Sequence, residues 1–305
     1  MESSAMNPLV AVAGATGNAG KEIVRAAHAS GLRVRALVRS EARLQPVREC
    51  VDEVRVVQVT EPESVAGCLE GAAYLVSALG KTYQKDRIPR RDVDVGANLH
   101  LFREAARAGV RRVLLVSVFG ADPRHEVALV RMKGEVEEAL VSSGLPFVIV
   151  QPTGFFSDMW ELFQMGLRGT LWVFGREEVG FNPISLEDLG AFVVRSLLDE
   201  GKGGCRLPCG GPEVLTPTDI AAMVSRVTGR RVRVRHIPLW LARAGVAMVR
   251  PFHQDLWEMA QFFVEQATLL KAEGGTVLAP VVGEQRLEDY YRRRWAELQA
   301  RSERG

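Results

Sequence analysis

The chain lacks the features on which most metal, secreted and membrane proteins depend. Its four cysteines and five histidines are scattered along 305 residues, so we expect reduced thiols and no metal centre. No apolar run approaches the length of about eighteen residues that a membrane span requires, so we expect no such span. The start, MESSAMNPLVAVAGATG, has no charged region followed by a long apolar one, so residues 1–7 are expected to be a disordered tail. These absences indicate a cytoplasmic protein.

Charge of one sign is also scarce. The net charge is +2, and neither a long basic run nor an aromatic RNA-binding motif is present, so we expect no nucleic-acid partner. An apolar content of 47% and a charged content of 25% are those of an ordinary globular protein. The length allows a main domain with a smaller lobe.

Residues 10–24, VAVAGATGNAGKEIV, place Gly14, Gly17 and Gly20 between a short apolar run and a helical pattern. A strand, a tight glycine turn and a helix start suit a dinucleotide pyrophosphate, because the free N–H groups of the helix face the anion. The predicted cofactor contacts in this turn are Gly14, Thr16, Gly17, Asn18 and Gly20. The alternative is a glycine-rich turn that serves packing alone.

Strand and helix patterns alternate after this turn. The predicted strands are 9–13, 33–39, 53–59, 72–79, 111–119 and 146–152, with helical patterns at 18–30, 42–50, 62–70, 92–108 and 125–143. This alternation predicts an α/β fold, a doubly wound parallel sheet of the Rossmann type. The pattern loosens afterwards, so we expect a dinucleotide-binding domain at 8–155. A smaller α/β lobe with C-terminal helices is then expected at 156–305, packed on the same sheet.

The end of the second predicted strand indicates which dinucleotide is bound. NAD-binding units place an acid there, whereas this chain reads LVRSEARL, with Arg39 at the strand end and no acid before Glu41. A guanidinium offers several donors in a fixed fork that fits a 2′-phosphate. We therefore predict NADP(H) as the cofactor, with Arg39 on the phosphate. The alternative is a solvated strand-end arginine.

The segment VDVGANLHLFREAARAGVRRVLLVSVFGAD resembles short-chain dehydrogenase/reductases of the extended and atypical kinds. Asn98 and Ser117 match the helix asparagine and the strand-end serine of that pattern. The segments GATGNAGKEIV, RMKGEVEEAL, GLPFVIVQPTGFF, NPISLEDLGAF and RLEDYY follow in the order found in NmrA-like atypical reductases. The resemblance is closest to the divinyl (proto)chlorophyllide 8-vinyl reductase-like group and covers about residues 8 to 292.

Departures from the family pattern limit what this resemblance implies. Lys133 matches the lysine of Tyr-x-x-x-Lys, but Leu129 stands where that motif has its tyrosine, so ordinary alcohol–ketone chemistry is disfavoured. The chlorophyllide reductase-like group also lacks the tyrosine and reduces a carbon–carbon double bond, which implies hydride delivery to a conjugated alkene. Val118 replaces the second serine, Gln151 an arginine that often precedes Pro152, and Thr60 a strand-end aspartate.

The resemblance and the strand ends together suggest further site residues. We expect Lys133 to donate to the nicotinamide ribose and Ser117 to polarise the substrate, the alternatives being a solvated lysine and a loop hydrogen bond. The remaining predicted cofactor contacts are the backbones of Ser77 and Ala78 beside the adenine, and of Pro152 and Thr153 at the nicotinamide carboxamide.

The predicted substrate contacts are aromatic. Phe155, Phe156 and Trp160 form an apolar wall for a flat substrate, unless they are core residues between sheet and lobe. Tyr83, in the basic loop GKTYQKDRIPRRD, is the nearest substitute proton donor, although a solvated loop is the simpler interpretation.

The sequence therefore predicts an NADP(H)-dependent atypical short-chain reductase. Its expected partner is an apolar, conjugated small molecule that undergoes C=C or quinone-type reduction; homodimer formation is left open. The alternative is a non-catalytic NADP(H)-binding redox sensor or structural subunit, because the missing tyrosine is compatible with both. A sugar-nucleotide epimerase is disfavoured, since that chemistry normally needs the tyrosine.

Overall fold

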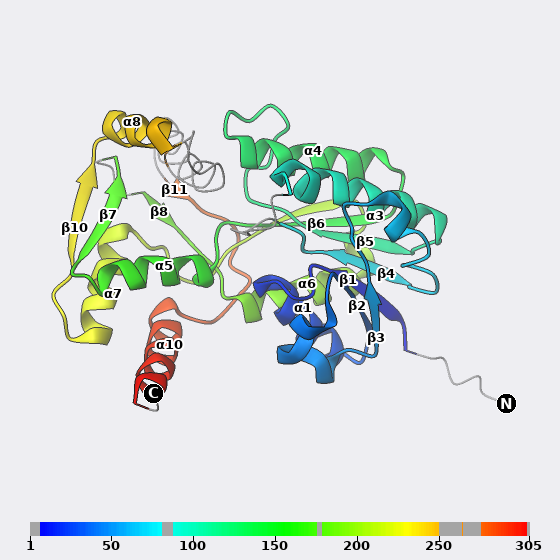
Figure 1. Ribbon diagram of the computed structural model, residues 1–305, viewed down its shortest axis with the longest axis horizontal. Helices are drawn as coiled ribbons and strands as arrows, with labels where there is room; N and C mark the ends of the chain where they lie inside the picture. The colour runs from blue at the N-terminus through cyan, green and yellow to red at the C-terminus, as the bar shows by residue number, and fades with distance from the viewer. Residues whose placement is uncertain (1–6, 81–87, 176–178, 250–263, 265–275, 304–305) are drawn as a thin grey trace. The chain divides into compact units, whose positions relative to one another are not determined.

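The computed structural model describes residues 7–80, 88–175, 179–249, 264 and 276–303. The chain divides into two compact units (Figure 1). The first contains residues 1–125, 129–152 and 186–208, and the second contains 126–128, 153–185 and 209–305. The sequence predicts a single boundary after residue 155, whereas the chain returns to the first unit to add two helices and one strand.

The first unit is built on a seven-stranded sheet. In sheet order its strands are β3 (Glu53–Val56), β2 (Arg33–Val38), β1 (Leu9–Ala13), β4 (Tyr74–Ser77), β5 (Arg112–Val116), β6 (Phe147–Pro152) and β9 (Cys205–Cys209). Neighbours from β3 to β6 pair in parallel. The predicted doubly wound parallel sheet is confirmed. Its strand order reverses between β1 and β4, and at such a switch point open α/β sheets bind their ligands beyond the carboxyl ends of the strands.

Helices cover both faces of this sheet. They are α1 (Asn18–Ala29), η1 (Glu41–Cys50), α2 (Pro62–Val65), η2 (Asp92–Gly96), α3 (Ala97–Arg107), α4 (Ala128–Ser142), α6 (Leu186–Leu198) and η3 (Glu200–Lys202). Figure 1 shows α3 and α4 on one face and α1 and α6 on the other. Helix α6 lies very close to α1, because a Cβ on Gly190 would be 2.6 Å from the Glu22 carbonyl oxygen. The central strands β1, β2, β4, β5 and β6 are buried on both faces, which explains their nearly continuous apolar runs.

The second unit combines two small parallel sheets with helices. Its elements are β7 (Thr170–Phe174) paired with β10 (Arg233–Ile237), β8 (Gly180–Phe181) paired with β11 (Thr276–Val277), and helices α5 (Phe156–Gly166), α7 (Pro217–Thr228), α8 (Leu239–Val249) and α10 (Leu287–Ser302). An aromatic core joins α5 to α10, where the buried Tyr291 hydroxyl donates to the Met159 carbonyl oxygen at 2.7 Å. Helix α7 begins with a reciprocal cap between Thr216 and Asp219.

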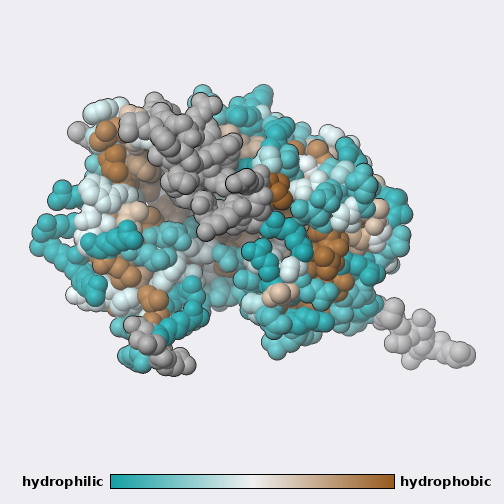
Figure 2. Space-filling model, in the orientation of Figure 1, coloured by the Kyte–Doolittle hydropathy of each residue, from teal (hydrophilic) through white to brown (hydrophobic). Residues whose placement is uncertain are grey.

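The start of α8 leaves large apolar side chains in solvent. Trp240 is 71% exposed and Leu241 is 49% exposed. Figure 2 shows hydrophobic surface where Figure 1 places α8. Among the described residues, no helix is long and apolar enough to cross a membrane.

Candidate functional site

The turn between β1 and α1 has no room for side chains at two of its three glycines. Gly14 has φ +83°, and a Cβ there would be 2.8 Å from the Ala78 carbonyl oxygen at the end of β4. A Cβ on Gly20 would be 2.0 Å from the Gly14 carbonyl oxygen. Any larger residue at Gly20 would therefore push the helix away from the turn. Gly17 is exposed and has no such clash with a neighbouring segment, so it leaves the backbone open to a ligand.

Helix α1 begins in a way that favours an anion. Its N-cap is Gly17, no side chain caps it, and its first turn contains no acid. The N–H groups of a helix's first turn have no partner within the helix, and the helix dipole adds positive potential there. The cradle formed by the turn and this helix start is compatible with a pyrophosphate, and the predicted contacts of its residues stay predictions. Arg39 follows β2 directly and is exposed, at the strand end where an adenosine ribose would be read.

Lys133 is held at the carboxyl end of β4 by two oxygen atoms from other segments. Its Nζ donates to the Leu79 carbonyl oxygen at 2.8 Å and lies 3.6 Å from Asp94 Oδ1. The Lys133 side chain is only 12% exposed and that of Asp94 only 2%. A Cβ on Gly80 would be 3.8 Å from Lys133 Nζ, so the chain beyond β4 passes beside the ammonium group. Lys133 is therefore not a solvated surface lysine.

Asp94 is linked to two further polar side chains. Arg90 Nη1 lies 3.8 Å from Asp94 Oδ2, so the carboxylate stands between two cations. Asn98 donates to the Asp94 carbonyl oxygen at 2.8 Å and accepts from the buried Ser77 hydroxyl at 2.5 Å. The Ser77 side chain thus fixes α3 against β4. The predicted cofactor contacts of Ser77 and Ala78 were assigned to their backbones, and they stay predictions.

Ser117 carries a buried hydroxyl at the end of β5. It is 5% exposed, and its Oγ has no hydrogen-bond partner within the described part of the chain. Its N–H donates to the Val150 carbonyl oxygen at 2.8 Å, which fixes the backbone. An unsatisfied buried hydroxyl costs about 1–3 kcal/mol. It therefore provides a place for a ligand group at the sheet edge that the sequence assigns to the nicotinamide and substrate.

The backbones of Pro152 and Thr153 already make protein contacts. Thr153 N–H donates to the Cys209 carbonyl oxygen at 3.1 Å, and its hydroxyl donates to the Asn182 carbonyl oxygen at 2.7 Å. The Pro152 carbonyl oxygen accepts from Phe119 N–H at 3.0 Å. A carboxamide contact here would use the second lone pair of Pro152 or the Thr153 carbonyl, and it stays a prediction.

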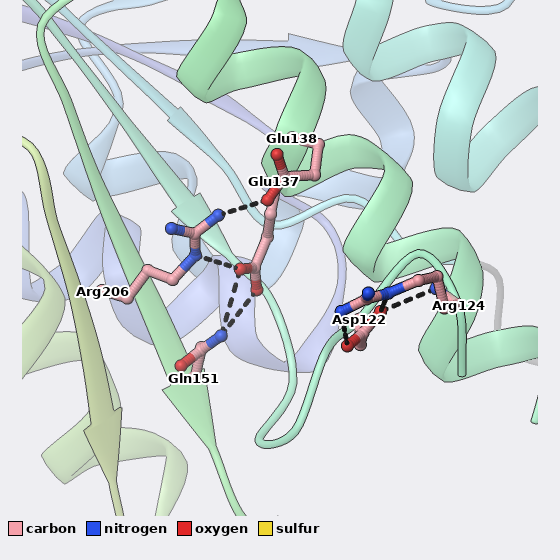
Figure 3. A network of polar contacts seen from close by, with 6 residues as sticks. All are labelled: Asp122, Arg124, Glu137, Glu138, Gln151 and Arg206. Carbon is pink, nitrogen blue, oxygen red and sulfur yellow. Dashed lines mark hydrogen bonds and ion pairs between the residues drawn. The ribbon is translucent and has the colours of Figure 1, made fainter.

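One turn beyond Lys133, α4 buries a second charged side chain (Figure 3). Glu137 is 1% exposed and accepts from Gln151 Nε2 at 2.9 Å and 3.1 Å and from Arg206 Nε at 2.8 Å. Figure 3 shows the glutamate of α4 meeting the glutamine of β6 and the arginine of β9. Gln151 stands where the family pattern often has arginine, and Arg206 supplies a guanidinium from the neighbouring strand instead.

The loop that follows β5 is closely packed on α4. A Cβ on Gly134 would be 2.2 Å from the Asp122 carbonyl carbon, so only glycine fits beside Lys133. Figure 3 shows Asp122 and Arg124 in this loop, where Arg124 N–H donates to Asp122 Oδ1 at 2.7 Å. This backbone hydrogen bond lowers the pKa of Asp122. The loop and the Glu137 network together fix the part of α4 that carries Lys133.

The predicted substrate residues have different environments. Phe156 is 2% exposed and belongs to the aromatic core within the second unit. Trp160 is half-buried and stacks on Phe163 with 4.6 Å between ring centroids, and Phe155 is also half-buried. Their pocket role stays a prediction. Tyr83 lies outside the described residues, and within those residues no cluster of side chains could hold a metal ion.

Sequence reasoning missed Asp94, Glu137 and Arg206. Two signals were present: an acid four residues before Asn98, and a glutamate four residues after Lys133 on the same helix face. Arg206 had no local signal, because its partner lies 69 positions earlier in the chain.

Comparisons with known proteins identify relatives of the whole fold. The sequence profile of a family described as NAD(P)H-binding matches residues 14–200. The chain is 30% identical over 315 residues to the chloroplastic divinyl chlorophyllide a 8-vinyl-reductase of Oryza sativa subsp. indica, which covers 93% of this chain and 78% of that relative. It is 28% identical over 232 residues to the photosystem II assembly factor Ycf39 of Guillardia theta, with 75% and 73% covered. These matches confirm the resemblance drawn from the motifs.

A solved structure gives the same fold. The NADPH-dependent quinone oxidoreductase QOR2 of Escherichia coli, complexed with NADPH, has a TM-score of 0.69 and 18% identity to this chain. The match covers 92% of this chain and 98% of that structure's chain. At this identity the similarity establishes the fold alone.

Proposed function

The chain belongs to the NAD(P)H-binding family, and we propose that it is an NADPH-dependent reductase of an apolar, conjugated small molecule. One observation carries the proposal. A glycine cradle suited to a pyrophosphate and a nearly buried lysine lie at the same carboxyl edge of the sheet, and no tyrosine precedes that lysine by four residues. Such an edge can orient a dinucleotide but lacks the usual catalyst of alcohol oxidation.

The cradle would hold the pyrophosphate, and Arg39 would select the 2′-phosphate of NADP(H) over the free hydroxyl of NAD(H). Arg39 is exposed at the end of β2. No carboxylate that could accept from a ribose hydroxyl follows the strand before Glu41. Charge-assisted hydrogen bonds of this kind contribute about 1.5–3 kcal/mol each.

The proposed reaction adds a hydride and a proton to a conjugated C=C bond or a quinone. NADPH supplies the hydride when it is bound. The Nζ of Lys133 would bind the nicotinamide ribose, and its positive charge would stabilise the anion that forms on the substrate. The Ser117 hydroxyl would orient the polar end of the substrate, and the proton comes from Lys133 Nζ, a loop residue or water.

The proposal is tested by following NADPH absorbance with a panel of quinones and conjugated alkenes. The wild-type chain should oxidise NADPH with at least one acceptor. Lys133→Met should lower kcat at least tenfold while the fold is retained, with Arg103→Met, at an exposed arginine of α3, as the matched control. Tight NADPH binding without oxidation by any acceptor would refute the reductase.

A second function is supported by a separate observation. The Guillardia theta relative is an assembly factor, and its similarity is close to that of the vinyl reductase. A non-catalytic NADP(H)-binding subunit would bind the cofactor, oxidise none of it and recognise a partner protein. Thermal unfolding with NADPH and with NADP⁺ separates the two functions. A redox sensor must bind the two cofactor forms with different affinities, so its unfolding temperature should differ between them, whereas an enzyme need not show such a difference.

A further inference from the structure

The outer face of the β7–β10 sheet in the second unit is basic. In the parallel register Arg235 is beside Trp172, and Arg233 is two residues earlier on the same strand. Side chains alternate along a strand, so Trp172, Arg233 and Arg235 share one face. The opposite face carries Leu171 and Val234, which pack into the core of the unit. Arg231 precedes the strand in the same alternation and is also exposed.

Carboxylates do not balance this charge. The segment 220–249 contains six arginines and no aspartate or glutamate. Arg231, Arg233 and Arg235 make no side-chain hydrogen bond or ion pair with any residue that the structure describes. Arg226, in the helix before this strand, by contrast pairs with Glu288 at 2.5 Å. Three arginines without a carboxylate partner among the described residues are therefore gathered on this one sheet face.

Large apolar side chains lie in the same region. Trp172 is 47% exposed on the basic face, and Trp240 and Leu241 are exposed by 71% and 49% at the start of α8. Helix α8 follows β10 after Pro238 alone, so this apolar pair lies at the end of the basic strand (Figure 1). Figure 2 shows the hydrophobic surface of α8 at the upper left and hydrophilic surface along the adjoining edge.

We propose that these six residues, Trp172, Arg231, Arg233, Arg235, Trp240 and Leu241, form a docking face for an anionic lipid membrane. Arginines attract the charged headgroups, and tryptophan is favoured at the boundary between headgroups and acyl chains. Leu241 supports a lipid surface over a nucleic acid, because an aliphatic side chain inserts among acyl chains and does not stack on bases. The attachment is peripheral and independent of the proposed reductase activity.

Co-sedimentation of the full chain with vesicles tests the docking face. Binding is expected to vesicles of equal parts phosphatidylcholine and phosphatidylglycerol, and to be at least tenfold weaker to phosphatidylcholine alone or at high salt. Arg233→Gln with Arg235→Gln should lower partitioning about 25-fold, about fivefold for each arginine. The matched control, Arg55→Gln with Arg103→Gln, removes the same charge from exposed arginines of the first unit and should leave partitioning unchanged.

A second variant examines the apolar contribution. Trp240→Ala should weaken vesicle binding and reduce the blue shift of tryptophan fluorescence on binding, with the unfolding temperature unchanged because the side chain is exposed. The proposal is overturned if anionic vesicles are not bound, or if both arginine pairs weaken binding equally. It is also overturned if a single-stranded oligonucleotide binds the chain while vesicles do not, since the face would then be a nucleic-acid site.

Discussion

Lys133 is held by a hydrogen bond and an ion pair from two segments far from it in sequence. The Leu79 carbonyl oxygen is at 2.8 Å and the Asp94 carboxylate oxygen at 3.6 Å. Asp94 is buried and belongs to η2, which in turn is joined to β4 through Asn98 and Ser77. Asp94 is therefore a positioning residue, because it acts through the lysine and its neighbours.

Replacing Asp94 with asparagine tests this role. Asp94→Asn keeps the size of the side chain but removes the charge beside Lys133, so we expect kcat to fall at least tenfold. The dissociation constant of NADPH should change less than threefold, because the glycine cradle is untouched. Asp92→Asn, on the exposed side of the same helical turn, is the control and should leave both quantities unchanged. An equal loss of kcat and of NADPH affinity would mean that Asp94 serves only the fold.

Arg39 gives a prediction about cofactor choice. Arg39→Gln removes the positive charge at the end of β2, so NADPH should bind about 10- to 100-fold more weakly, as expected for the loss of a charge-assisted hydrogen bond. Binding of NADH should not change, since it has no 2′-phosphate. Calorimetric titration of wild type and variant with both cofactors measures the difference. If NADPH and NADH lost the same affinity, the 2′-phosphate would not be the partner of this arginine.

The site residues that the sequence predicted and those that it missed differ in how far apart along the chain their defining neighbours lie. The glycine turn and Arg39 follow strands in a local pattern, so their positions could be derived from a few neighbouring residues. Asp94 and Lys133 are 39 positions apart, and only the packing of η2 against α4 brings them together. The spacing to Asn98 marks Asp94 as a candidate, but nothing in a single sequence pairs it with Lys133.

Helix α4 is anchored at its middle by a buried charge, which allows a prediction on stability. Glu137→Gln leaves Arg206 without its buried partner, so unfolding in urea should require about 1–3 kcal/mol less free energy. Glu138→Gln is the matched control: Glu138 also pairs with Arg206, but it is 53% exposed, and we expect a loss below about 0.5 kcal/mol. Equal losses for the two variants would show that burial of Glu137 contributes nothing.

At the level of elements, the strands with long apolar runs were predicted well, whereas short elements with polar residues were not. All six strands predicted in the first sheet are present, with ends within three residues of those observed. Strand β9, CRLPC, was not predicted, because its burial is uneven and Pro208 is disfavoured inside a sheet. The predicted helix at 62–70 is only the four-residue α2, because Ala66 has an extended backbone and Gly67 a positive φ.

Each of the two units is built from three separate segments of the chain, and this constrains the order in which the protein can fold. The first unit draws on three segments, and its seventh strand comes more than fifty residues after the sixth. Thus the sheet cannot be completed until the first part of the second unit has been synthesised. The single boundary after residue 155 that the sequence predicts would not by itself impose this requirement.

Cofactor binding at β1 should therefore protect the sheet as far as β9. Cys68 and Cys209 are 4% and 0% exposed, so reaction with iodoacetamide should require the structure to open. Burial also raises the pKa of Cys68 to about 11 and that of Cys209 to about 12, which lowers their reactivity at neutral pH further. NADPH at 100 times its dissociation constant should slow labelling of both about 100-fold. Cys50, which is half-buried, is the internal control and should label at an unchanged rate. Mass spectrometry of the labelled peptides measures each rate separately. If only Cys68 were protected, β9 would open independently of the strands that hold the cofactor, and the seven-stranded sheet would not be one cooperative body.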